Sequence, residues 1–258
     1  MKKKLITCLL LCLPIFAQAS SGIKLSKADI NLENKDSLRA GAKLFVNYCL
    51  SCHSASFMRY SRMGKDLSMS DDQVTQNLMF IANFENRDEG EPKKIGDLMT
   101  VAMKTKDAKK YFGTLVPDLT TVARVRGADW LYTYLTSFYA DEKRPYGVNN
   151  TVFSSVAMPH VLWELDGIKQ RVPKKDENGK VIMDHADREV MELVPLTKGT
   201  MSDVEYKRAM NDLVNFMVYM GEPIKLERQS IGIFVMFFLL VFFLFAYLLK
   251  KEYWKDIH

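Results

Sequence analysis

The feature that most constrains this chain is the pentapeptide 49–53, in which Cys49 and Cys52 are followed directly by His53. This C-x-x-C-H spacing is typical of covalent haem attachment, where two thiols bond to one haem and the adjacent imidazole binds the iron. We therefore predict one haem c, with thioether bonds to Cys49 and Cys52 and with His53 as an axial ligand. The surrounding chain must then fold around a large, flat, apolar group.

A C-x-x-C pair also occurs in redox dithiols and in zinc sites, and both fit this sequence less well. A redox dithiol of the thioredoxin type needs a βαβ context, and no such alternation of strand and helix patterns is seen. Half of a zinc site needs a second pair of Cys or His ligands, and the sequence offers none. The remaining cysteines, Cys8 and Cys12, lie in the first 19 residues, so a disulfide framework is also excluded.

Residues 1–19 have the pattern of a secretory signal peptide. Three lysines at Lys2–Lys4 precede the apolar stretch Leu5–Phe16, and Ala17-Gln18-Ala19 fits the rule for a cleavage site. An uncleaved anchor is the alternative, but the apolar stretch is short for a membrane span and a cleavage motif follows it. We predict that the signal is removed on export, which leaves the two cysteines of the pentapeptide in the mature chain.

A second apolar segment, Ile231–Leu249, contains no charged residue. At about 1.5 Å per residue, a helix of this length extends roughly 28 Å, enough to cross the hydrocarbon core of a bilayer. A buried core helix is the alternative, but such helices are rarely so uniformly apolar. The lysines that follow, Lys250, Lys251 and Lys255, favour a cytoplasmic C-terminus.

These signals predict a single-pass protein of the inner (cell) membrane with its main domain in the periplasm. The formal net charge of +5 is concentrated at the two ends of the chain. Basic and acidic residues nearly balance in between, so no nucleic-acid partner is expected. The predicted organisation is a signal peptide at 1–19, a periplasmic haem domain at 20–222, a linker at 223–230, a transmembrane helix at 231–249 and a cytoplasmic tail at 250–258.

Apolar periodicity and capping signals predict several helices in the periplasmic domain. The strongest follows Ser202, because Ser202-x-x-Glu205 is a capping box, and Gly221 and Pro223 should end this helix. Asn178-Gly179, within a highly charged stretch, predicts a two-stranded hairpin on the surface. The expected helices are 37–49, 70–84, 95–105, 130–139 and 202–220.

The second axial ligand of the iron must come from elsewhere in the chain. His258 follows the predicted membrane helix, and His185 lies in the charged stretch, which leaves His160 among the histidines. Met158 is the best methionine candidate, because Pro159 prevents a helix and holds the preceding backbone extended. The local sequence alone leaves the other methionines and His160 open.

At this point the chain resembles the cytochrome c1 family, the haem subunits of the quinol–cytochrome c reductase (cytochrome bc1) complex. The likeness extends from about Gly41 to Trp254 and rests on several separate motifs besides the pentapeptide. These motifs are Gly-Ala-Lys-Leu-Phe at 41–45, Val-Pro-Asp-Leu at 116–119, Ala-Arg-Val-Arg-Gly at 123–127, Ala-Met-Pro at 157–159 with Leu-Trp at 162–163, Gly-Thr-Met-Ser at 199–202, Asp-Leu-Val-Asn-Phe at 212–216 and Glu-Pro at 222–223.

The resemblance implies an all-α fold, with a class I cytochrome c core, insertions, and one C-terminal membrane helix. It also implies that Cys49 and Cys52 bind the haem covalently and that His53 and Met158 are the axial pair.

Two further residues are assigned a role only by the resemblance. Arg126 would lie against a haem propionate, where a guanidinium offers a forked donor to a carboxylate. Pro117 would pack on the haem. The family often has two prolines before its Asp-Leu pair, whereas Val116 takes the first place here. An exposed, solvated Arg126 is the alternative.

The resemblance further implies single-electron transfer without independent catalysis. The donor would be a Rieske iron–sulfur protein, the acceptor a cytochrome c, and the membrane neighbour cytochrome b, within a dimeric multi-subunit complex. Two alternatives stay open: a membrane-anchored cytochrome c that serves a terminal oxidase or another dehydrogenase, and an enzyme or gas sensor with an open sixth position. The acidic segment Glu85–Glu91 is either a docking surface for a basic cytochrome c or simply solvated.

Overall fold

The computed structural model describes residues 24–80, 92–101 and 103–256. The predicted signal peptide and the acidic segment 85–91 lie outside these ranges. The helices are α2 (Lys35–Leu44), α3 (Tyr60–Asp66), α4 (Asp71–Leu78), α5 (Thr105–Phe112), α6 (Val122–Arg126), α7 (Ala128–Thr136), α8 (Trp163–Asp166), α9 (Asp203–Gly221) and α10 (Lys225–Tyr253), with a π-helical turn η1 (Phe45–Cys49). The strands are β1 (Ala55–Arg59), β2 (Leu98–Met99), β3 (Phe138–Ala140), β4 (Val148–Asn150), β5 (Lys169–Pro173) and β6 (Met191–Pro195).

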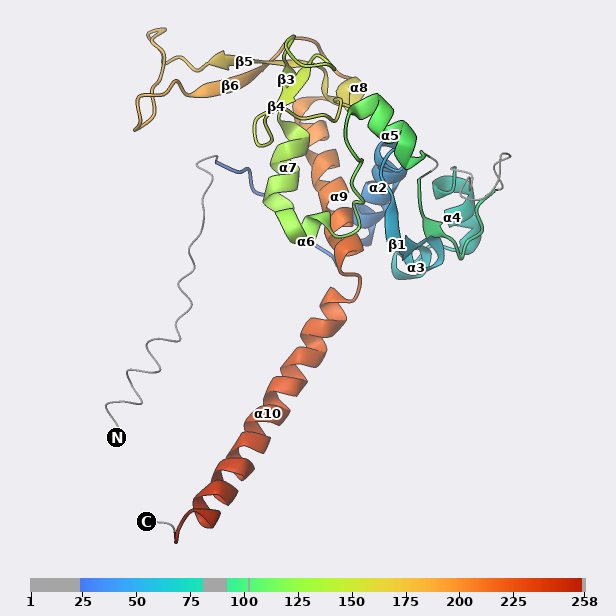
Figure 1. The fold of residues 1–258 in the computed structure, drawn as a ribbon, viewed down its shortest axis with the longest axis vertical. Helices are drawn as coiled ribbons and strands as arrows, with labels where there is room; N and C mark the ends of the chain where they lie inside the picture. The colour runs from blue at the N-terminus through green and yellow to red at the C-terminus, as the bar shows by residue number, and fades with distance from the viewer. Residues whose placement is uncertain (1–23, 81–91, 102, 257–258) are drawn as a thin grey trace.

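The core is organised by the crossing of α2 and α9, two helices far apart in the sequence (Figure 1). Gly41 permits the close approach, since a Cβ at this position would overlap the carbonyl oxygen of Asp212. Beside the crossing, the rings of Phe45 and Phe216 lie 5.6 Å apart, and Ser37 Oγ donates to Asp212 at 2.6 Å. The contact fixes the position of the turn that ends at the first cysteine of the pentapeptide.

Helix α9 begins as the sequence predicts. Ser202 Oγ accepts from the backbone N–H of Glu205 at 3.3 Å, and the Glu205 carboxylate accepts from the backbone N–H of Ser202 at 2.8 Å, which completes the capping box. The apolar face of α9 packs against α2, α6 and α7. Asn215 on this helix also donates to the carbonyl of Asn31, so the segment before α2 is held along its side.

One predicted helix, 95–105, is wrong. In its place, β2 pairs with β1, and α5 begins only at Thr105. The apolar spacing of this segment imitates a helix, but its carbonyl groups bind other parts of the chain. Ser61 N donates to the carbonyl of Ile95, and Tyr60 N donates to that of Asp97. Carbonyls used in this way are not available for helical i→i+4 hydrogen bonds.

The helical haem-domain fold is confirmed in part, because the described residues also contain three two-stranded antiparallel sheets. Each sheet consists of a single pair of strands, so it adds strands without changing the helical core. The tight turn between β3 and β4 uses Gly147 at a φ of 68°, a conformation that glycine adopts without strain. The expectation of an all-α fold was therefore too narrow.

The hairpin predicted around Asn178-Gly179 is present and projects from the domain as an arm (Figure 1). Strands β5 and β6 form its base, and its end divides into two smaller turns, one closed by a bridge between Lys175 and Val181 and the other by a bridge between Met183 and Glu189. Gly179 has a φ of 80°, as a tight turn requires. We refer to residues 169–195 below as the arm.

Helix α10 leaves the domain as a single long rod (Figure 1). It has 29 residues and is long and apolar enough to cross a membrane. It begins at Lys225, so most of the predicted linker 223–230 is helical. The cause is local, because Lys225, Glu227 and Arg228 are good helix formers, and a helix continues beyond its membrane-spanning part at little cost. Glu222 accepts from Arg228 and lies 3.7 Å from Arg124 of α6, which ties the junction to the domain.

Candidate functional site

The pentapeptide begins in the last turn of a helix. The π-helical turn η1 ends at Cys49, whose carbonyl accepts from the backbone N–H of Cys52 at 3.1 Å and of His53 at 2.8 Å. Two hydrogen bonds to one carbonyl close the loop tightly. The motif therefore holds its two thiols and its imidazole in a fixed relation before any ligand binds.

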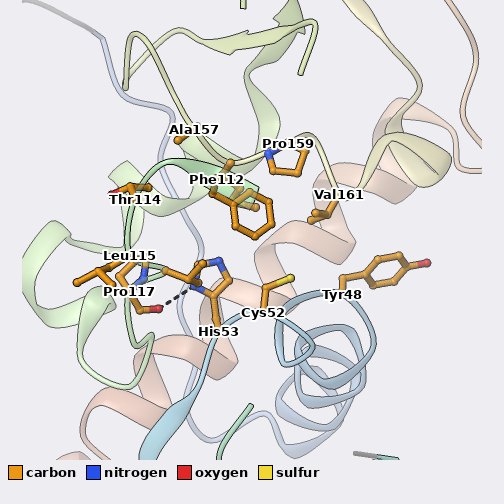
Figure 2. A pocket seen from close by; sticks show the side chains of 12 residues that line it. Tyr48, Cys52, His53, Phe112, Thr114, Leu115, Pro117, Ala157, Pro159 and Val161 are labelled. Carbon is orange, nitrogen blue, oxygen red and sulfur yellow. Dashed lines mark hydrogen bonds between the residues drawn. The ribbon is translucent and has the colours of Figure 1, made fainter. Parts of the chain in front are cut away.

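His53 presents one ring nitrogen as a free ligand. Its Nδ1 lies 2.8 Å from the carbonyl oxygen of Pro117, and Figure 2 shows this contact as a dashed line. Because a carbonyl only accepts, the proton belongs on Nδ1, and Nε2 keeps its lone pair. Burial lowers the pKa of His53 more than the Pro117 hydrogen bond and the Asp118 charge raise it, so the neutral ring that an iron ligand requires is favoured.

The segment 117–120 is itself anchored to the chain that follows His53. Asp118 accepts from the backbone N–H groups of Ser56 and Thr120, each at 2.8 Å, and Leu119 N donates to the carbonyl of Ser54 at 2.9 Å. Burial opposes ionisation of Asp118, but the hydrogen bonds from Thr120 and Ser56 outweigh it and hold its pKa below the ordinary value. This network fixes the Pro117 carbonyl, and with it the orientation of His53.

Met158 borders the same space from a different part of the chain. Two cavities, of about 80 and about 300 Å³, are both lined by His53, Pro117 and Met158. Cys52 lines the smaller cavity and Cys49 the larger one. Figure 2 shows the His53 ring pointing into the smaller cavity, below Phe112. The four residues predicted to bind haem and iron are therefore brought together.

These residues fit a haem with two thioether bonds. His53, which has one imidazole nitrogen without a hydrogen bond in the described part of the chain, and the thioether of Met158 line both apolar cavities, and each cavity is also lined by one of the two cysteines. Most other lining residues are apolar, which suits the porphyrin ring and excludes water from it.

Comparison with known proteins agrees with this chemistry. The family model described as the Cytochrome C1 family matches residues 29–257. The chain belongs to the cytochrome c1 family. Membership implies haem c and a role in electron transport.

Individual proteins that are similar to this chain carry names that differ from one another. Cytochrome c1 of Allochromatium vinosum is 45% identical over 261 residues, and the match covers 100% of both chains. A protein of Nitrosomonas europaea named ammonia monooxygenase gamma subunit is also 45% identical, over 94% of each chain. A chain of a solved structure called Hyperthermophilic respiratory Complex III is 16% identical, with a TM-score of 0.42, and the match covers 100% of this chain and 95% of that one.

Cys49 and Cys52 are not joined to each other by a disulfide bond. Burial, and to a smaller degree the neighbouring Cys52, raises the pKa of the Cys49 thiol to about 12.

Arg126 lies at the larger cavity, but its immediate neighbours are aromatic. Its guanidinium carbon lies 4.9 Å from the ring centre of Trp130 and 6.0 Å from that of Phe153. Within the described residues it forms no ion pair with a carboxylate. A guanidinium held over aromatic rings at the mouth of a cavity remains available to an acidic group of a ligand.

The histidines weighed against Met158 as axial ligands lie away from the two cavities. His160 is buried and stacks on Phe138 at 4.8 Å, with its Nε2 3.5 Å from Asp166. His185 is exposed on the arm. Of the other methionines in the described chain, Met217 lines the larger cavity, but it lies on α9 on the face that packs into the core.

Sequence analysis missed Tyr134, whose hydroxyl donates to Met158 Sδ at 3.4 Å. Tyr134 also stacks on Trp130, one helical turn away, with ring centres 5.1 Å apart. The aromatic spacing of the segment 130–139 was the available signal, since residues four apart share one helix face. The spacing of the aromatic residues could not predict that Met158 lies against Tyr134.

Proposed function

We propose that this cytochrome c1 is the haem c subunit of a quinol–cytochrome c reductase complex and transfers single electrons from a Rieske iron–sulfur protein to a cytochrome c. The observation that carries the proposal is that His53 and Met158 line both cavities, while Cys52 lines the smaller one and Cys49 the larger one. Family membership supports the same class of electron-transport protein.

In this proposal, Cys49 and Cys52 form the thioether bonds, and His53 Nε2 and Met158 Sδ hold the iron. Haem supplies a one-electron couple when bound, and a His/Met pair favours a high reduction potential. His53 is held in one tautomer by the Pro117 carbonyl, which makes it a constant ligand in both oxidation states. Tyr134 donates to the Met158 sulfur, and Arg126 is available to a propionate.

The proposed anchor is the apolar part of α10, with the haem domain in the periplasm and the tail 250–258 in the cytoplasm. Lysines after the apolar segment favour this orientation. Only Glu222–Ile224 separate α9 from α10, and the contacts of Glu222 with Arg124 and Arg228 brace the junction. The haem would therefore be held near cytochrome b, where a tethered donor has a high effective concentration.

A second candidate assembly is suggested by the name of the Nitrosomonas relative, which is as similar in identity as the Allochromatium cytochrome c1. The chain would then serve an ammonia monooxygenase with the same haem site but different neighbours. A membrane-anchored cytochrome c that serves a terminal oxidase would likewise have the same haem site but different neighbouring subunits. The partners, rather than the haem chemistry, distinguish these functions.

Purification of the tagged full-length protein from its native membranes tests the proposal. We expect cytochrome b and a Rieske protein to co-purify, and the preparation to reduce cytochrome c with a quinol. Monooxygenase or oxidase subunits in their place would contradict the assignment. The optical spectrum of the same sample tests the gas-sensor alternative, because a six-coordinate haem should bind little carbon monoxide, whereas an open sixth position binds it readily.

A further inference from the structure

The segment that delivers Met158 contains neither helix nor strand between Thr151 and Pro159. It follows β4 directly, so the β3–β4 hairpin is its nearest regular structure. Such a segment places a side chain accurately only if its backbone is held by other parts of the chain. The contacts of residues 155 and 156 show where that hold comes from.

Arg144, in the turn between β3 and β4, donates from Nη2 to the carbonyl of Ser155 at 2.9 Å and to that of Val156 at 3.4 Å. Asn149, on β4, accepts the backbone N–H of Ser155 at 2.9 Å. Asn149 is fixed in turn by its donation to Asp141 at 2.9 Å. Both backbone groups of Ser155 are therefore bound by the hairpin.

Ser155 adopts an unfavourable backbone conformation at this point. Its φ is 60°, in the left-handed region that non-glycine residues rarely occupy. Such a conformation persists only where the surroundings impose it. Here the hydrogen bonds that Ser155 makes with Arg144 and Asn149 impose this backbone conformation. The bend turns the chain so that Val156 enters the small apolar cluster with Phe138 and Val148, against which Met158 packs.

No carboxylate of the described residues lies at ion-pair distance from Arg144. Its charge still acts on Asp141, whose pKa is lowered chiefly by the hydrogen bond from Asn149 and to a smaller degree by the charges of Lys143 and Arg144. The Arg144 side chain is half-buried, and its Nε is buried without a hydrogen bond to any residue that the structure describes. The hydrogen bonds that its side chain does make go to the two carbonyls of the segment before Met158.

We propose that Arg144 is a positioning residue, which holds the segment 155–158 so that the Met158 sulfur stays on the iron. The inference rests on the proposed role of Met158 as axial ligand. Arg144 and Asn149 constrain the backbone before the methionine, whereas Tyr134 constrains the sulfur itself. Both hydrogen bonds come from the single nitrogen Nη2, so the position that the planar guanidinium gives this atom matters more than the charge.

The test uses the full-length, haem-loaded protein in membranes and two readouts of ligation. These are the weak long-wavelength absorption band that a thioether ligand gives ferric haem, and carbon monoxide binding by the ferrous protein. Arg144→Gln should lose most of the band and bind carbon monoxide. Arg144→Lys keeps the charge but not the reach and planar geometry that place Nη2 between the two carbonyls, and should restore the band only in part.

Control variants distinguish the effect of Arg144 on the segment 155–158 from a general effect of charge and from an error in the assignment of Met158 as ligand. Arg188→Gln removes an arginine that is paired with Asp184 on the arm, and should leave both readouts unchanged. Met158→Leu should lose the band completely. Asn149→Ala provides a second test should Arg144→Gln not accumulate, and it should weaken the band in the same direction.

A full band and no carbon monoxide binding in Arg144→Gln would overturn the proposal. Complete recovery in Arg144→Lys would also overturn it, because charge alone would then suffice. Retention of the band in Met158→Leu would instead show that Met158 is not the ligand, and the positioning role of Arg144 would fail together with that assignment. Failure of the Arg144 role alone and failure of the Met158 assignment therefore give different results.

Discussion

The two sides of the haem site are built in different ways. On the His53 side, the ligand lies in a short motif, and the carbonyl of Pro117 orients it. The segment that contains Pro117 is held to the chain directly after the motif by hydrogen bonds of the backbone N–H groups of Ser56 and Leu119. On the Met158 side, the ligand lies on an irregular segment held by side chains of Arg144, Asn149 and Tyr134. The first side is recognisable from sequence, whereas the second depends on contacts between distant residues. We expect ligation to be more easily disturbed on the Met158 side.

The largest effect is expected from the attachment residues. Cys49→Ala or Cys52→Ala should leave at most one thioether bond, so haem stain after denaturing electrophoresis should weaken severely or disappear. The absorption band of the reduced protein should also shift, because one vinyl group is then restored to the ring. A normal two-thioether spectrum in Cys49→Ala would contradict the attachment.

The next effect tests the Met158 side directly. Met158→Leu should open the sixth position, allow carbon monoxide to bind and lower the reduction potential, because thioether ligation favours the ferrous state. We expect a fall of more than ~59 mV, the equivalent of a ten-fold change in the one-electron equilibrium. Redox titration measures this. An unchanged potential without carbon monoxide binding would move the ligand to another residue, with His160 as the first to test.

A smaller effect is expected at the mouth of the larger cavity. Arg126→Ala removes a positive charge and its contact with Trp130, so the potential should fall by less than about 59 mV. The lost cation–π contact should also lower the free energy of unfolding by about 0.5–1 kcal/mol. Arg126→Lys should restore only part of either quantity. Wild-type potential and thermal stability in Arg126→Ala would make this arginine an ordinary surface residue.

The smallest effect on the haem iron is expected on the His53 side. Asp118→Asn should keep His53 bound to the iron but reduce the free energy of unfolding by about 1–2 kcal/mol, because hydrogen bonds to a charged acceptor are lost. The pKa of Asp118 is lower in the folded protein than its ordinary value of 3.8. Its stabilising contribution is therefore complete above that value and is lost as the pH falls through the lower folded pKa.

Acid unfolding of the wild type and of Asp118→Asn, followed by the haem spectrum, measures this contribution. The two proteins should differ at neutral pH and converge in acid. A constant difference down to the lowest pH would show that the carboxylate charge is not what stabilises the segment 117–120.

The helix expected at 95–105 failed for a reason that its local pattern does not show. The segment has suitable apolar spacing, yet the carbonyls of Ile95 and Asp97 bind Ser61 and Tyr60, which are close only in the folded chain. At the other end of the domain, α10 begins at Lys225, within the segment expected as a linker, because its polar residues are good helix formers.

The sequence by itself determined the features whose signals are local. The C-x-x-C-H motif indicates haem attachment, the Ser202 capping box begins α9, Asn178-Gly179 forms a tight turn at the end of the arm, and Ile231–Leu249 is apolar enough to span a membrane. These depend on spacing and residue chemistry over a few positions.

Only the tertiary structure placed Met158 at the same cavities as His53, turned Tyr134 toward its sulfur and brought Arg144 to the carbonyls of Ser155 and Val156. These contacts join residues that no local period relates. They follow from the packing of α7 against α9 and from the separate small cluster of Phe138 and Val148 on the β3–β4 hairpin, which the whole chain brings together.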